Sequence, residues 1–323
     1  MNARFLEIEI TGKCLYKCRH CYGDFPKAGE FSLDTIRQIT EEARGLFDCL
    51  IFSGGEPFLH KDLPAMVAEA GKDFLIFITT SGYPISDEQL SQIRHKSILV
   101  FGLDGIGETH DAYRGFSGAF KNLVQAMDRA RDVPKEIIVT LWKGVIPQID
   151  DIIKLAGDYN AIVHFNGLIP VGRAKENPDI LPEQKDLEQA YEKLLKLKMT
   201  GGSVVTDLHK VGEKDKQEGI ALFCRNRYNI TPLGDVRPCE FHNAVLGNIY
   251  KESLKEIIRR AQQSPLIQAR EEGFKNHVRL DLKNPFDYHT TICHRLPFIA
   301  GTCYCNEKYL PGISRGFIRC THG

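Results

Sequence analysis

The alternation of short apolar segments with longer amphipathic ones, from residue 5 to about residue 200, constrains the fold of this chain more than any other feature. β-Branched and aromatic residues fill the short segments, as is typical of buried strands, and the longer segments repeat apolar residues at helical spacing. This rhythm predicts an α/β fold built on a parallel sheet or barrel. The predicted strands are Phe5–Ile10, Leu50–Ser53, Phe74–Thr79, Ile98–Asp104, Ile137–Trp142 and Ala161–Ile169.

The segment between the first two strands illustrates the helical pattern. Ser32 is a candidate N-cap, and one apolar face is formed by Ile36, Ile39, Ala43 and Leu46. Six strand–helix units are fewer than a closed eight-stranded barrel needs. An open sheet, a split barrel and part of a larger assembly are all compatible with the pattern.

A change in composition divides the chain near residue 206. A predicted helix, Glu183–Thr200, is followed by the polar stretch Asp207–Gly219, which is typical of a linker. Beyond it the helical rhythm fades, and six of the ten cysteines lie there. We therefore expect a core domain at 1–206, a linker at 207–219 and a cysteine-rich domain at 220–323.

Charge and hydropathy exclude several classes of protein. Lys+Arg and Asp+Glu both count 42, and no long basic tract is present, so the chain lacks the basic surface of a nucleic-acid-binding protein. The longest apolar runs, 74–78 and 98–103, are too short to span a membrane, and the N-terminus lacks the apolar core of a signal peptide. We expect a soluble, cytoplasmic protein without a nucleic-acid or membrane partner.

Three cysteines follow the first predicted strand within eight residues: Cys14, Cys18 and Cys21. Thiolates this close together repel one another or oxidise unless a metal neutralises them. Structural zinc and cubane iron–sulfur clusters both normally take four protein ligands, so three leave a position open for a substrate or cofactor. His20 could be a fourth ligand, although we expect a histidine in this tight turn to face solvent or pack on a ligand.

The spacing C-x3-C-x2-C after a first strand resembles the signature of the radical S-adenosylmethionine (radical SAM) superfamily. The resemblance implies a partial (β/α)6 barrel, with a 4Fe–4S cluster on the three cysteines and S-adenosylmethionine on the fourth iron. It also implies that an electron from a donor such as flavodoxin or ferredoxin cleaves the cofactor to a 5′-deoxyadenosyl radical, which abstracts hydrogen from a substrate. Tyr22 is the aromatic residue that commonly follows the third cysteine, with its backbone near the adenine.

Small and polar residues follow the later strands. Gly54 and Gly55 allow a ligand to approach the backbone closely, and Glu56 can accept a hydrogen bond from an ammonium group. The radical SAM resemblance implies that this GGE segment contacts the amino group of the cofactor; a plain strand-to-loop turn is the alternative. Ser81 and Asp104 end the third and fourth strands, on the face where barrel-type enzymes place their sites, so we expect them to point toward the cofactor.

Two further segments resemble radical SAM proteins with a C-terminal SPASM or twitch extension. The first is LDG-x2-E-x-HD-x2-RG at residues 103–115, although the serine usual before it is Gly102 here. Its polar residues belong either to the site or to a solvated, salt-bridged loop: His110, Asp111 and Arg114. The second is PVGRA at 170–174, in which Arg173 can hold a carboxylate and is expected to border the cofactor.

The C-terminal cysteines also resemble a known pattern. The spacing from Cys224 to Cys239, with LGNI at 246–249, is similar to the opening of a SPASM or twitch domain, which implies at least one auxiliary 4Fe–4S cluster on these two cysteines. The later spacing departs from the SPASM pattern, so the six cysteines form either one cluster with two thiols left over or two clusters. The other candidate ligands are Cys293, Cys303, Cys305 and Cys320, with His242 and His294 expected at the surface.

Residues outside these motifs have plainer roles. Cys49 is expected to be a buried apolar thiol. Trp142 is expected to pack in the core; the alternative places it in the barrel interior with His164 and Asn166.

These features favour a radical SAM enzyme, an oxidoreductase or maturase that modifies a residue of a peptide or protein. A small metabolite, a carbohydrate or a tetrapyrrole is the alternative substrate. The first strand begins at residue 5, which leaves no room for a separate N-terminal peptide-recognition domain and counts against a leader-guided peptide modifier. A small metabolite, or a peptide delivered by another protein, stays open. A non-enzymatic metalloprotein, a zinc scaffold or an electron carrier, explains the cysteines but not the GGE segment or the polar strand ends.

Overall fold

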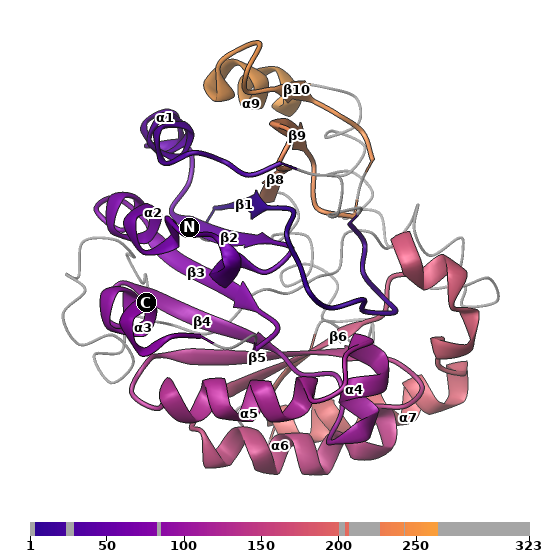
Figure 1. Cartoon of the computed structure of the whole chain (residues 1–323). Helices are drawn as coiled ribbons and strands as arrows, with labels where there is room; N and C mark the ends of the chain where they lie inside the picture. The colour runs from indigo at the N-terminus through magenta and orange to yellow at the C-terminus, as the bar shows by residue number, and fades with distance from the viewer. Residues whose placement is uncertain are drawn as a thin grey trace.

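The computed structural model of the chain describes residues 4–23, 29–82, 85–199, 204–206, 227–241 and 243–263 (Figure 1). Its centre is a ten-stranded sheet in the order β10-β9-β8-β1-β2-β3-β4-β5-β6-β7. The strands from β8 to β7 pair in parallel, and β8, β9 and β10 pair antiparallel. The strands are β1 (Phe5–Thr11), β2 (Cys49–Gly54), β3 (Leu75–Thr80), β4 (Ser97–Gly102), β5 (Lys135–Leu141), β6 (Ile162–Gly167), β7 (Val204–Thr206), β8 (Arg227–Ile230), β9 (Asp235–Arg237) and β10 (Gly247–Asn248).

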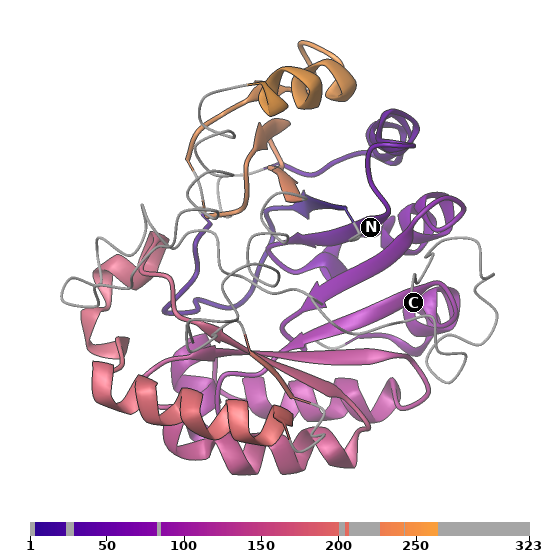
Figure 2. The same ribbon diagram turned by 180° about the vertical axis from the view of Figure 1, so that it is seen from behind.

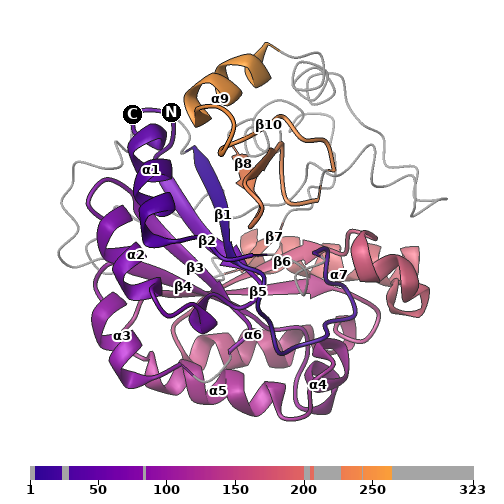
Figure 3. The same ribbon diagram turned by 45° about the horizontal axis from the view of Figure 1, so that its top comes forward.

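Helices lie along the outer face of this curved sheet, as Figure 2 and Figure 3 show. The α-helices are α1 (Leu33–Ala43), α2 (Leu63–Ala70), α3 (Asp87–Ile93), α4 (Glu108–Arg114), α5 (Ala119–Arg129), α6 (Ile149–Asp158), α7 (Gln184–Met199) and α9 (Leu254–Gln262). Short 3-10 helices are η2 (Pro57–Leu59), η3 (Ile146–Gln148), η4 (Gly172–Glu176) and η5 (Pro178–Ile180).

The two faces of the sheet bury different kinds of side chain. Along β1, Leu6, Ile8 and Ile10 point outward and join the large apolar core under the helices. Fully burying such a side chain contributes about 1.5–3 kcal/mol. The inner face has a smaller apolar layer, which includes Phe5. Glu7 and Glu9 alternate with the outward residues and are also buried, so the inner face becomes polar toward the carboxyl end of β1.

The six predicted strands are confirmed as β1 to β6, with ends that differ by up to two residues. Ser32 caps α1 by accepting a hydrogen bond from the Thr35 backbone N–H, and α7 coincides with the predicted helix at 183–200. β7, β8, β9 and β10 were not predicted, because strands of two to four residues have too few positions to show a periodicity.

β8 extends the parallel sheet next to β1 and connects it to the β9 and β10 hairpin strands. Within the described residues, β7 and β10 are the two edges of the sheet, so the sheet is open. The predicted linker at 207–219 lies outside the described residues. Among the helices the structure describes, none combines the length and the apolar character that crossing a membrane requires.

Candidate active site

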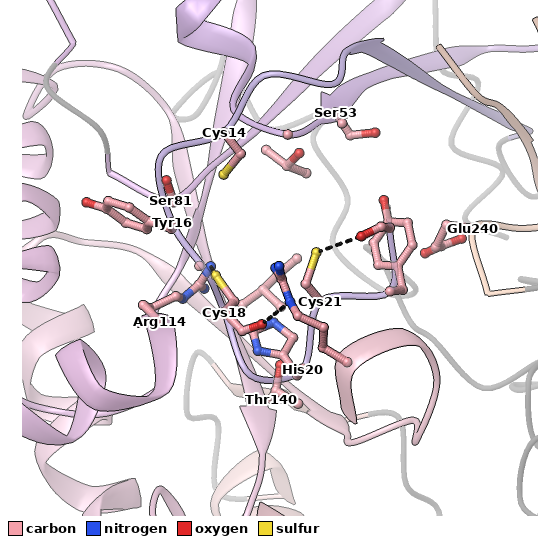
Figure 4. A pocket seen from close by; sticks show the side chains of 18 of the residues that line it. Cys14, Tyr16, Cys18, His20, Cys21, Ser53, Ser81, Arg114, Thr140 and Glu240 are labelled. Atoms are coloured by element: carbon pink, nitrogen blue, oxygen red, sulfur yellow. Dashed lines mark hydrogen bonds between the residues drawn. The ribbon is translucent and has the colours of Figure 1, made fainter. Parts of the chain in front are cut away.

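A cavity of about 330 Å³ lies at the carboxyl ends of the central strands. The loop after β1 forms one wall, and the ends of β2, β3, β4, β5 and β6 contribute the others (Figure 4). Predicted site residues that line it are Cys14, Cys18, Cys21, Tyr22, Gly54, Gly55, Ser81 and Arg173. The fold therefore brings together side chains from sequence segments that are up to 159 positions apart, Cys14 and Arg173 being the extremes.

The three N-terminal cysteines surround one open space, toward which their sulfur atoms point (Figure 4). Burial raises the pKa of the Cys14 thiol to about 11, and it also raises the pKa of Cys18. Thiols in this environment ionise only when a cationic group neutralises them. Within the part of the chain that the structure describes, no three His, Cys, Asp or Glu side chains are grouped closely enough to hold a single metal ion. The donor set fits a cluster of several atoms better than a lone zinc ion.

Backbone contacts fix the loop that carries these cysteines. The N–H groups of Gly55 and Glu56 donate to the carbonyls of Thr11 and Lys13, at 2.8 and 2.7 Å. A Cβ atom on Gly55 would stand 2.1 Å from the Lys13 carbonyl oxygen, so the glycine is required by the passing loop as well as by any ligand. On the other side, the N–H of Arg173 donates to the Cys21 carbonyl at 2.9 Å.

Gly172 lets the PVGRA segment approach the same loop. Its φ is +51°, and a Cβ atom there would lie 2.3 Å from the carbonyl oxygen of Cys21. The Arg173 Nε donates to the carbonyl of Cys18 at 2.9 Å. Through these contacts the segment holds the backbone of two of the three cysteines.

Glu56 does not line the cavity, because its carboxylate is already fully hydrogen-bonded. One oxygen accepts from the Thr80 hydroxyl at 2.8 Å, and the other accepts from the N–H and hydroxyl of Ser81 at 2.8 and 2.6 Å. Burial raises the pKa of Glu56, and these hydrogen bonds partly offset that effect. Glu56 therefore orients Ser81, and direct contact with the cofactor stays a prediction.

Asp104 does not line the cavity either. Its side chain is fully buried and forms an ion pair with Arg114, which does line the cavity, at 2.7 Å. Burial by itself raises the pKa of Asp104, but the Arg114 guanidinium, together with His20, His110 and the Thr140 N–H, outweighs this and holds the pKa below its usual value.

The solvated-loop alternative for His110, Asp111 and Arg114 is wrong. His110 is fully buried, with its Nδ1 accepting from the Asp104 N–H at 3.0 Å. Asp111 accepts from the N–H groups of Gly118 and Phe120 at the start of α5, at 2.6 and 2.7 Å. His110 and Arg114 both contact Asp104, and Asp111 bonds the start of α5, so the segment is tied into the protein by contacts that sequence spacing does not reveal.

The wall formed with β8 contains charged residues that no sequence motif indicates. Arg227 forms ion pairs with Glu7 and with Glu240, the latter at 2.8 Å, and all three line the cavity. A signal was present in β1, since Glu7 and Glu9 share the inward face of a strand whose other face is apolar. Burial, reinforced by Glu7, raises the pKa of Glu9 to about 8.

Other predictions have mixed outcomes. His20 lines the cavity and stacks on Tyr113 with ring centroids 4.6 Å apart, and burial lowers its pKa to about 4. Trp142 also stacks on the Tyr113 ring, with ring centroids 4.3 Å apart, so its predicted role in core packing is confirmed. Cys49 is a buried thiol in the inner apolar layer, as expected.

Of the two polar residues considered for the barrel interior, Asn166 lines the cavity. His164 is not a lining residue, and its Nε2 lies 3.2 Å from a carboxylate oxygen of Glu136.

Of the predicted auxiliary-cluster ligands, the structure describes Cys239, which is 7% exposed and directly precedes the cavity residue Glu240. The remaining candidates lie outside the described residues: Cys224, Cys293, Cys303, Cys305 and Cys320, with His242 and His294.

Comparison with known proteins connects these features to characterised families. A family model described as the radical SAM superfamily matches residues 8–156, and one described as an iron–sulfur cluster-binding SPASM domain matches residues 224–282. An AdoMet-dependent heme synthase of Methanosarcina barkeri is 27% identical over 290 residues, covering 80% of this chain and 83% of the relative. The subtilosin biosynthesis protein AlbA of Bacillus subtilis is 26% identical over 323 residues, covering 95% of this chain and 67% of the relative.

Solved structures agree on the fold. SuiB of Streptococcus suis, bound to its precursor peptide SuiA, superimposes with a TM-score of 0.66 at 14% identity, covering 87% of this chain and 68% of SuiB.

Proposed function

This chain belongs to the radical SAM superfamily and carries a SPASM iron–sulfur domain, and from this premise we propose that it removes hydrogen from a residue of a peptide or protein substrate. It is an enzyme whose cofactors are S-adenosylmethionine, a 4Fe–4S cluster that binds it, and an auxiliary iron–sulfur cluster. When bound and reduced, the N-terminal cluster supplies the electron that converts S-adenosylmethionine to a hydrogen-abstracting 5′-deoxyadenosyl radical.

Each residue around the cavity has a defined task in this proposal. Cys14, Cys18 and Cys21 hold the N-terminal cluster, because their sulfurs face the same space. Gly54, Gly55, Tyr22, Ser81 and Arg173 line the cavity that S-adenosylmethionine shares with the cluster. Glu56 keeps the Ser81 hydroxyl oriented, and Asp104 does the same for Arg114. Cys224 and Cys239, with later cysteines, are the proposed ligands of the auxiliary cluster.

The pairing of charges in the cavity wall carries the choice of a peptide or protein residue as substrate. A tetrapyrrole with several carboxylates requires several cationic partners. Two of the arginines that line the cavity are already matched by carboxylates, Arg114 by Asp104 and Arg227 by Glu7 and Glu240. The similarity to AlbA, a bacteriocin biosynthesis protein, also supports a peptide substrate, whereas the similarity to heme synthases points to the alternative.

The test is a comparison of the two substrate classes under anaerobic, reducing conditions. The reconstituted enzyme is incubated with S-adenosylmethionine and either short peptides encoded next to its gene or iron coproporphyrin. We expect deuterium from a labelled peptide to appear in 5′-deoxyadenosine, seen by mass spectrometry. Turnover of the porphyrin alone would contradict the proposal, and the Cys14→Ala variant controls for chemistry that does not require the cluster.

A further inference from the structure

We propose that Arg114 is a positioning residue that donates a hydrogen bond to the sulfur of Cys18 and thereby raises the reduction potential of the N-terminal cluster. Arg114 Nη1 lies 3.9 Å from Cys18 Sγ, within reach of the long hydrogen bonds that sulfur accepts. The inference concerns the cluster alone, and it stands whether the substrate is a peptide or another molecule.

Asp104 fixes the guanidinium in this orientation. The carboxylate contacts Arg114 Nη2 at 2.7 Å and also accepts from the N–H of Thr140 at 2.8 Å. The Asp104 carbonyl accepts from Trp142 Nε1 at 2.8 Å. Because Asp104 is held from several sides, the arginine cannot rotate away from Cys18 without breaking a buried ion pair.

Gly102 provides the space that the guanidinium occupies. A Cβ atom at this position would stand 2.1 Å from Arg114 Nη2 and 3.0 Å from Cζ. Any side chain at position 102 therefore displaces the end of Arg114, so the observed position of the guanidinium requires a glycine here. The contacted atoms are the far end of a flexible side chain, so a substitution here moves the guanidinium and leaves the backbone of β4 in place.

A donor aimed at a ligand sulfur stabilises the more negative, reduced form of an iron–sulfur cluster. Hydrogen bonds to the sulfurs and the local charge are two of the factors that set cluster potentials. Arg114 supplies both at once, and its 11% side-chain exposure limits screening by water. Asp104 offsets part of the charge, but the N–H that faces Cys18 remains.

A second arginine near the same loop provides a matched control. Arg19 directly follows Cys18, but its guanidinium pairs with Asp179 at 2.7 Å and with Asn177 at 3.1 Å. Arg19→Met removes a positive charge next to the cluster loop without removing a contact to a ligand sulfur.

The experiment is a redox titration of the reconstituted holoenzyme, monitored by electron paramagnetic resonance. The N-terminal cluster is identified as the signal that changes when S-adenosylmethionine is added. We expect Arg114→Met and Gly102→Ser each to lower the ratio of reduced to oxidised N-terminal cluster about tenfold at a fixed potential. This corresponds to a decrease of about 59 mV in the reduction potential of a one-electron couple. Arg19→Met should stay within about twofold of the parent ratio, which is less than 20 mV.

Two results would overturn the proposal. One is a parent-like ratio in Arg114→Met, or in Gly102→Ser if the first variant assembles no cluster. The other is an equally large decrease in Arg19→Met, because the effect would then reflect overall charge and not the contact with Cys18.

Discussion

Replacing Glu9 by Gln should stabilise the protein, and increasingly so as the pH rises. Glu9 is 4% exposed on the inner face of β1, where it accepts a hydrogen bond from Asn229 at 3.1 Å. Burial and the nearby Glu7 raise its pKa from 4.5 to about 8. Glutamine keeps the shape and the acceptor oxygen but carries no charge, so it imitates the protonated acid.

The sign of the effect follows from proton binding. Between pH 4.5 and about 8 the folded chain holds a proton on Glu9 that the unfolded chain releases, so stability decreases as the pH rises through this window. One pKa unit corresponds to 1.36 kcal/mol, and the full shift therefore costs at most about 5 kcal/mol above the window. Glu9→Gln should recover up to about 2 kcal/mol near pH 6 and up to about 5 kcal/mol near pH 9.

The assay is denaturation of the reconstituted protein under anaerobic conditions, followed by circular dichroism at both pH values. Glu30→Gln is the control, because hydrogen bonds from Lys13 and Thr11 outweigh the desolvation of this carboxylate and lower its pKa. That variant should lose a little stability near neutral pH and show no gain at high pH. If Glu9→Gln and the parent respond identically to pH, Glu9 is ionised in the folded protein and this reasoning is refuted.

Three further predictions concern the site itself. Replacing Cys14, Cys18 and Cys21 together by alanine should abolish cleavage of S-adenosylmethionine while the auxiliary iron persists. The control variant Cys49→Ala should retain both the cleavage activity and the full iron content, because this thiol lies in the inner apolar layer. Unchanged cleavage in the triple variant would refute this role for the triad. Gly172→Ala should reduce iron incorporation and lower the free energy of unfolding by about 1–3 kcal/mol, since the φ of Gly172 is +51° and a Cβ atom there would meet the Cys21 carbonyl. The control is Gly157→Ala in α6, where a Cβ atom would meet nothing within 4 Å, and this variant should keep full iron content. Equal iron content in the two variants would contradict the role of Gly172. Glu56→Gln should weaken S-adenosylmethionine binding up to about tenfold, because the amide nitrogen cannot accept a hydrogen bond of about 0.5–1.5 kcal/mol from Ser81 or Thr80 and Ser81 loses its orientation. Parent-like binding by calorimetry with an intact cluster would rule that contribution out.

The cysteine loop and the barrel strands could be predicted because their signals are local. Cys14, Cys18 and Cys21 occupy one short segment, and each of the six longer strands is a short run rich in β-branched and aromatic residues. The positions of Gly54, Gly55 and Ser81 on the cavity wall then follow from a general property of parallel sheets, whose carboxyl ends lie at one edge.

The roles of Glu56 and Asp104 could not be predicted in the same way. Both follow strands and carry a carboxylate, so the sequence suggests that both face the cofactor. In the structure their oxygens are used by Ser81, Thr80 and Arg114, because a buried carboxylate is stable only when hydrogen-bonded or paired. Which partner is nearby depends on the packing of neighbouring strands.

The sequence by itself determined the α/β class and the superfamily, and it predicts the cysteine ligands of the N-terminal cluster, since periodicity and motif spacing are properties of contiguous residues. Only the tertiary structure decided the charged wall, in which Glu7 meets Arg227 across 220 positions, and the contact of Arg114 with Cys18 across 96. The physical reason is that burial and ion pairing depend on strand register and on which side chain fills a given space. The register of β8 against β1 and the absence of a side chain at Gly102 set these contacts, and neither is visible until the chain has folded.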